Sequence, residues 1–114
     1  MHIIDEIAQK ESVRTYSLME LGIHDVAFSR NDTIKIINRL EKELLPILGG
    51  DVFLIEQGHV NGPISNSWYC EREYDESWYT FVRRSCEMAI HAVLNEKAKN
   101  ALFEIVVSDC PDDL

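Results

Sequence analysis

The sequence DESWYTFVRRSCEMAIHAVLNEKAKNALFEIVV, residues 75–107, decides the predicted fold. In its first half apolar side chains recur every three or four positions, which is typical of an amphipathic helix, and Asp75 is positioned to cap that helix. The second half ends in residues 102–107, which are rich in β-branched side chains and predict a strand. The helix side that we expect to be buried consists of Trp78, Phe81, Val82, Ser85, Ala89, Ala92 and Val93.

The predicted strand presents two different faces. Because successive side chains of a strand point to opposite sides, Phe103, Ile105 and Val107 share one face. Glu104 and Val106 share the other. We expect the phenylalanine and its face to point into the core and the glutamate to point away from it.

Two more helices are predicted upstream. Residues 2–11 place several apolar side chains on one helical side. A second helix begins after Ser29, with Asp32 three residues later in an arrangement that resembles a capping box. This helix should end at about residue 45, because Pro46 cannot continue it.

The middle of the chain predicts a β-hairpin. Gly49 and Gly50 are typical of a turn, residues 52–57 are rich in β-forming side chains, and residues 67–71 form a second such run after a loop. Helices followed by a hairpin, a helix and a strand are the order of an α+β domain. We therefore expect a small, mostly antiparallel sheet of about three main strands, with helices packed on one face and the other face open.

Length and composition limit the class of protein. With 114 residues, 46% of them hydrophobic and 27% charged, the chain matches one folded domain over residues 1–114. We expect the acidic tail from residue 108 to fray. No apolar run is long enough for a membrane span, and the N-terminus lacks the basic start of a signal peptide. A cytoplasmic protein is expected.

The chain is strongly acidic, with 20 acidic residues against 11 basic ones and a net charge of −9. Such a field repels phosphate backbones and anionic lipid surfaces, which disfavours binding to nucleic acid or to membranes. It attracts cationic partners. The simpler alternative is that the excess charge only keeps a small protein soluble.

No catalytic or metal-binding pattern stands out. Cys86 and His91 are the best pair of nucleophile and base, but a separation of five residues turns them apart on a helix. Cys70 and Cys110 are not arranged with histidines at the spacing of a metal site, and three widely spaced cysteines indicate reduced thiols. We expect no catalytic residue, no metal and no cofactor.

Aromatic and acidic residues are concentrated around the second half of the hairpin and the start of the helix that follows. Rigid rings beside carboxylates are typical of protein-binding surfaces, since the rings supply affinity and the charges guide association. Trp68 and Trp78 fall on the predicted core sides of their elements, whereas Tyr69 alternates to the other face. The tryptophans are therefore expected to be structural.

A single acidic face is the expected result of this pattern. If Phe53 and Ile55 point into the core together with Phe103, the open face of the sheet gathers carboxylates around Tyr69. The simpler explanation of the acids after residue 70 is a solvated, helix-capping loop, which is also compatible with binding. The candidate protein-binding residues are Glu56, Tyr69, Glu71, Glu73, Tyr74, Asp75, Glu76 and Glu104.

Five segments stand out together: MELGI at residues 19–23, VAFS at 26–29, ILGGDVF at 47–53, SWYC at 67–70 and ESWYTFVRRS at 76–85. Through these segments the chain resembles a known family, immunity protein 40, over residues 17–107. The resemblance implies a bacterial immunity protein that binds its cognate secreted polymorphic toxin domain in the cytoplasm and carries no catalytic motif. It supplies no binding residue position by position.

The leading hypothesis is therefore inhibition of one cognate toxin by occlusion. Two alternatives come from other classes: a small cytoplasmic enzyme that uses Cys86 or a carboxylate site, and a structural or adaptor subunit of an obligate oligomer. The enzyme requires a concave pocket with converging titratable groups. The subunit requires an exposed apolar patch and a stable oligomer in solution, and the sequence leaves the oligomeric state open.

Overall fold

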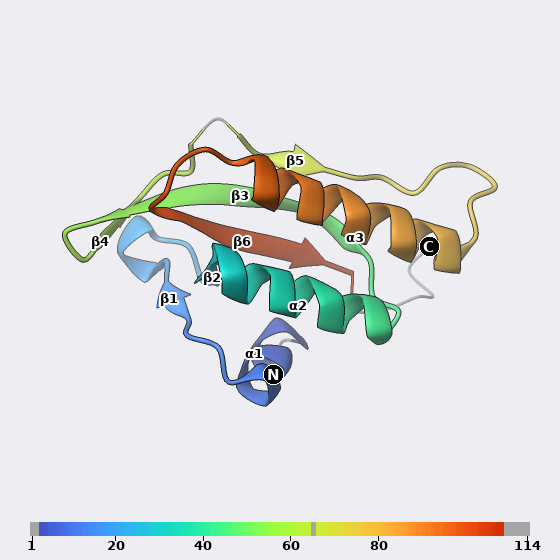
Figure 1. The fold of residues 1–114 in the computed structure, drawn as a ribbon, viewed down its shortest axis with the longest axis horizontal. Coiled ribbons are helices and arrows are strands. Elements are labelled where there is room, and N and C mark those ends of the chain that lie inside the picture. Colours follow the sequence, from blue (N-terminus) through green and yellow to red (C-terminus); the bar gives the residue numbers. More distant parts are fainter. Residues whose placement is uncertain (1–2, 65, 109–114) are drawn as a thin grey trace.

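The computed structural model describes residues 3–64 and 66–108 and consists of three α-helices packed against an antiparallel sheet (Figure 1). The predicted α+β class is confirmed. In chain order the elements are α1 (Ile3–Glu11), β1 (Tyr16–Ser17), the short 3₁₀ helix η1 (Met19–Leu21), β2 (Val26–Ser29), α2 (Arg30–Lys42), β3 (Ile47–Glu56), β4 (His59–Asn61), β5 (Trp68–Tyr69), α3 (Trp78–Asn95) and β6 (Ala101–Val107).

The sheet has six strands in the order β1-β2-β6-β3-β4, and β5 pairs with β3 on the same edge as β4. Its centre is the long antiparallel pair of β3 and β6. The prediction of about three main strands was wrong. β1, β2 and β4 contain only two to four residues each, which is too short for alternation to be recognisable in the sequence.

The main core lies between the sheet and the helices, since α2 and α3 lie on the same face of β3 and β6 (Figure 1). In β6, Phe103 and Ile105 pack against the helices, as the alternation predicts, and Val106 is exposed on the other side. On α3, Trp78 and Ala92 are only half buried. The predicted members of its core side that are buried are Phe81, Val82, Ser85, Ala89 and Val93.

The opposite face of the sheet is only partly open, because residues 16–23 and β4 contribute to a second core there. Phe53 and Ile55 belong to this second core, so the prediction that they point inward together with Phe103 was wrong. Both faces of β3 are apolar over this part, and alternation alone does not say which set meets the helices. The buried members of the second core are Leu18, Ala27, Phe53, Val60 and Leu102.

Gly49 and Gly50 lie inside β3, so the predicted turn was wrong. A Cβ on Gly50 would lie 2.3 Å from Cη2 of Trp68, and a Cβ on Gly49 would lie 2.5 Å from the carbonyl oxygen of the same tryptophan. The missing side chains therefore allow β5 to approach β3 closely, with an indole ring over the strand.

The ends of the helices depend on local side chains. The cap of α2 is confirmed, since Ser29 Oγ accepts a hydrogen bond from the amide of Asp32. The predicted cap of α3 was wrong: Ser77 Oγ accepts from the amide of Thr80, whereas Asp75 lies before the cap with a φ of 69°.

The second helix is shorter than predicted. It ends at Lys42, and Leu44 has a φ of 59° that no helix continues. The predicted first residue of the first helix, residue 2, and most of the tail expected to fray, residues 109–114, lie outside the described residues. None of the described helices is long and apolar enough to cross a membrane.

Candidate functional site

The loop between β5 and α3, residues 70–77, is attached to α3 through Arg84. The guanidinium donates two hydrogen bonds to the carboxylate of Glu76, from Nε to Oε2 at 2.7 Å and from Nη2 to Oε1 at 2.8 Å. It also donates to the carbonyl of Glu71 and to Sγ of Cys70. Because one planar side chain joins three loop positions to a helix, the loop is held in a defined conformation. We call it the Arg84-held loop.

Glu76 supports this loop from inside. Its Oε1 also accepts a hydrogen bond from the amide of Glu73, and Arg72 Nε donates to its carbonyl. The side chain is only 6% exposed. The hydrogen bonds from Arg84, and then the one from the amide of Glu73, lower the pKa of Glu76 to about 2. Sequence reasoning treated this carboxylate as a solvated contact residue, but the structure gives it an internal ion pair.

Glu76→Gln is expected to loosen the loop at neutral pH, because the neutral amide loses the charge-assisted pair with Arg84. Amide hydrogen exchange at residues 71–76 should accelerate at least about tenfold, while exchange in the middle of α3 should not change. Glu87→Gln, on the exposed side of α3, is the matched control and should leave the loop unchanged. Equal amide exchange of the loop in Glu76→Gln and in the wild-type protein would contradict the conclusion that the ion pair of Glu76 with Arg84 holds the loop.

The same ion pair predicts how the loop responds to acid. A lowered pKa means that the contribution of Glu76 to stability is fully present above its ordinary value of 4.5 and is lost as the pH falls toward 2. The wild-type loop should therefore lose its protection in this range before the core unfolds.

The Arg84-held loop and the adjoining strand present the other predicted residues to solvent. Tyr74 is 95% exposed and Tyr69 is 79% exposed. The carboxylates of Glu71, Glu73 and Asp75 are exposed between and beside them. We call these five residues the loop surface. Tyr74 and the three acids lie on the loop that leads into α3, and Tyr69 lies on β5, on the sheet face opposite to the helices.

Glu56 and Glu104 do not lie together, so the predicted single acidic face was wrong. Glu56 pairs with His59 at the end of β3, whereas Tyr69 pairs with Gly49 near the start of the same strand. Strand alternation also places Glu56 on the helix side of the sheet and Glu104 on the opposite side. The error follows from the assumed orientation of Phe53.

Glu104 is buried, with 8% of the residue exposed, although the sequence predicts an open surface there. It is the register partner of Asp51 in β3, and Asp25 approaches it from the β2 side. Burial, followed by these two neighbouring carboxyls, raises the pKa of Glu104 to about 8. Sequence reasoning missed both aspartates, because Asp51 follows two glycines that were assigned to a turn and nothing marks Asp25 as its neighbour.

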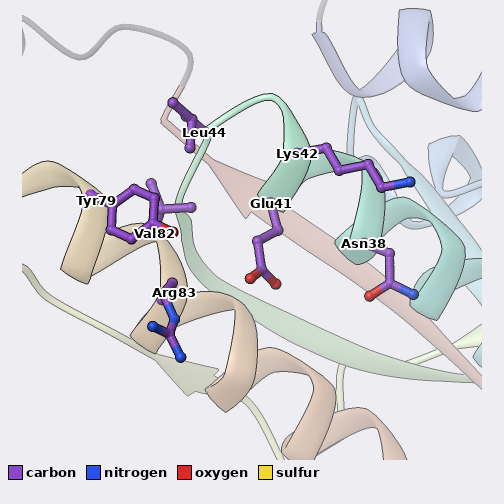
Figure 2. Close-up of a pocket in the computed structure, with 7 residues that line it drawn as sticks. All are labelled: Asn38, Glu41, Lys42, Leu44, Tyr79, Val82 and Arg83. Atoms are coloured by element: carbon purple, nitrogen blue, oxygen red, sulfur yellow. The ribbon is translucent and has the colours of Figure 1, made fainter.

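A shallow groove of about 510 Å³ lies between α2 and the start of α3 (Figure 2). Glu41 extends from α2 toward α3, and Arg83 lies on the α3 side (Figure 2). No cysteine, serine or histidine is among the residues that line the groove. Its lining residues are Asn38, Glu41, Lys42, Leu44, Tyr79, Val82 and Arg83.

The cysteine considered as a nucleophile is part of the core. Cys86 is fully buried, and burial raises the pKa of its thiol to about 12. His91 is exposed and contacts Asn95. Within residues 3–64 and 66–108, no group of three or more histidine, cysteine or acidic side chains is arranged to hold a metal ion. Cys110 lies outside the described residues.

Comparison with known proteins identifies one relationship. No curated protein and no solved structure matches the chain. The family model described as immunity protein 40 matches residues 17–107, which include β2 to β6, α2, α3 and the whole loop surface. The match covers most of the chain and agrees with the resemblance that its sequence segments indicate. The chain belongs to the immunity protein 40 family.

Proposed function

We propose that this protein binds one cognate secreted toxin domain in the cytoplasm and neutralises it by occlusion, with the loop surface at the contact. Family membership supports a protein toxin as the general class of partner. The observation that carries the proposed contact is Tyr74, which is 95% exposed although its loop is held by Arg84. A ring on an ordered loop loses little conformational entropy on binding, which is the property of an interface anchor.

The charge around Tyr74 suits a cationic partner. In the described part of the chain Glu71, Glu73 and Asp75 form no ion pair, so their field is available to a basic surface on the toxin. The net charge of −9 adds to this field. Complementary charge accelerates association and fixes the orientation of the partner. An interface of ordinary size covers about 800 Å² of each protein, so the contact would extend beyond the loop surface.

Tyr74→Ala is expected to weaken binding to the cognate toxin domain at least about tenfold, because an anchor ring is removed from the interface. The thermal melt should be unchanged, since the ring is almost entirely in solvent. Calorimetric titration measures the affinity. Leu94→Ala, which removes another exposed apolar side chain near the far end of α3, is the matched control and should bind like the wild-type protein.

Two outcomes separate the contact from the function. An unchanged affinity of Tyr74→Ala would exclude the loop surface as the binding site while leaving neutralisation intact. A wild-type protein that neither binds the cognate toxin domain nor protects cells that express this domain would contradict neutralisation itself.

A further inference from the structure

The carboxyl of Glu104 has acidic neighbours on both sides. The groups that face it are Asp51 from β3 and Asp25, which directly precedes β2, while its register neighbour in β2, Ala27, carries no charge. None of the ion pairs within residues 3–64 and 66–108 involves these three carboxyls. An ionised Glu104 would therefore carry its negative charge between two other carboxyl groups, at a position with little water.

The two aspartates already accept hydrogen bonds. Ser67 Oγ donates to Asp51 Oδ1 at 2.6 Å, and the amide of Val26 donates to Asp25 Oδ1 at 2.8 Å. Glu104 receives no such bond from a described donor, and a proton on its carboxyl would itself provide the donor that a neighbouring aspartate accepts. Carboxyls that share one site retain a proton among them, because adjacent like charges disfavour full ionisation.

We propose that Glu104 carries a proton at neutral pH and donates it in a hydrogen bond to Asp25 or Asp51, so that this carboxyl triad is a pH-sensitive element of the sheet. Loss of the proton places mutual repulsion where β2, β6 and β3 lie side by side. By strand alternation the triad lies on the same sheet face as Tyr69. The triad is independent of the toxin and of the proposed contact.

The direction of the pH effect follows from linkage. The pKa of Glu104 is raised from 4.5 to about 8, so the folded state binds more protons than the unfolded chain between these values. The free energy of unfolding must then fall as the pH rises through this window. The stabilising proton is fully present below the unfolded pKa and is lost above the folded one.

Glu104→Gln tests the triad, because glutamine retains a hydrogen-bond donor of similar shape and cannot ionise. Relative to this variant, the wild-type folding equilibrium should lose up to about tenfold per pH unit within the window. Its Tm should fall by at least about 4 °C more than that of the variant between pH 6 and pH 9. Glu56→Gln, at an exposed carboxylate of the same sheet, is the matched control and should follow the wild-type protein.

Parallel stability curves of the wild-type protein and Glu104→Gln from pH 5 to pH 9 would overturn the proposal. A second measurement needs no variant: carbon-13 NMR titration of the glutamate carboxyl groups in the wild-type protein. The Glu104 resonance should titrate with a midpoint above pH 7, and a midpoint below pH 7 would also overturn the proposal. Neither measurement involves the toxin, so its failure is distinct from failure of neutralisation.

Discussion

Gly50→Ala is expected to lower the free energy of unfolding by about 3 kcal/mol and the Tm by about 10 °C. An added Cβ would lie 2.3 Å from Cη2 of Trp68 and 2.6 Å from the carbonyl oxygen of Glu104. The indole is held over the strand by the pairing of β5 with β3, and the carbonyl belongs to the central pair of strands. Relief of the clash therefore requires movement of the sheet or expulsion of the ring.

Thermal and urea denaturation followed by circular dichroism measure this effect. Gly58→Ala is the control for the loss of a glycine: no atom lies within 4 Å of the added Cβ, but the φ of +80° makes alanine cost about 1 kcal/mol. Gly50→Ala in the background of Trp68→Leu should recover part of the lost stability, because the shorter side chain withdraws from the strand. A Gly50→Ala protein as stable as Gly58→Ala would contradict the close approach of the Trp68 indole to β3 at Gly50.

Arg30→Met is expected to lower the free energy of unfolding by about 2 kcal/mol, because it removes hydrogen bonds that join the start of α2 to the end of α3. The guanidinium donates to the carbonyls of Val93 and Ala98 and lies 5.6 Å from the centre of the Phe103 ring. Methionine retains much of the apolar stem but removes the guanidinium donors of both carbonyls, of which that of Ala98 still accepts a hydrogen bond from the amide of Ala101.

The position of Arg30 explains how the structure accommodates a cation at a helix start, where the helix dipole disfavours positive charge. Its guanidinium acts at the carboxyl end of a different helix, where the dipole favours it. Arg83→Met removes a largely exposed arginine of α3 whose contact with Glu87 is 3.9 Å long, and it is the control. Urea denaturation should show a lower free energy of unfolding for Arg30→Met alone. Equal decreases in both variants would contradict a stabilising role of the Arg30 hydrogen bonds.

Local signals predicted the elements that have strong periodicity. Five of the seven predicted core residues of α3, the alternation of β6 and the cap at Ser29 agree with the structure, because each depends on neighbours within a few residues along the chain. The same reasoning failed at Gly49 and Gly50, where a pair of glycines is the ordinary mark of a turn. Their actual role depends on an indole that lies far away in sequence.

The candidate site was predictable only in its composition. The sequence shows that aromatics and acids gather near Tyr74, and the structure exposes this tyrosine on a held loop. The sequence does not show that Glu76 is paired with Arg84 eight positions later, or that Glu104 is buried between aspartates. The sequence does not indicate which residue, if any, pairs with a given carboxylate. Exposed acids and internally paired acids therefore cannot be distinguished in the sequence.

By itself, the sequence of this immunity protein 40 family member determined the α+β class, the amphipathic α3 and the two faces of β6, because periodicity and capping are properties of short segments. Only the tertiary structure decided which face of β3 packs against the helices, why Gly50 lies under an indole and which carboxylates are exposed and not paired internally. These depend on strand register and on ion pairs between distant residues. Burial on both sides of β3 removes the alternation that would otherwise reveal its orientation.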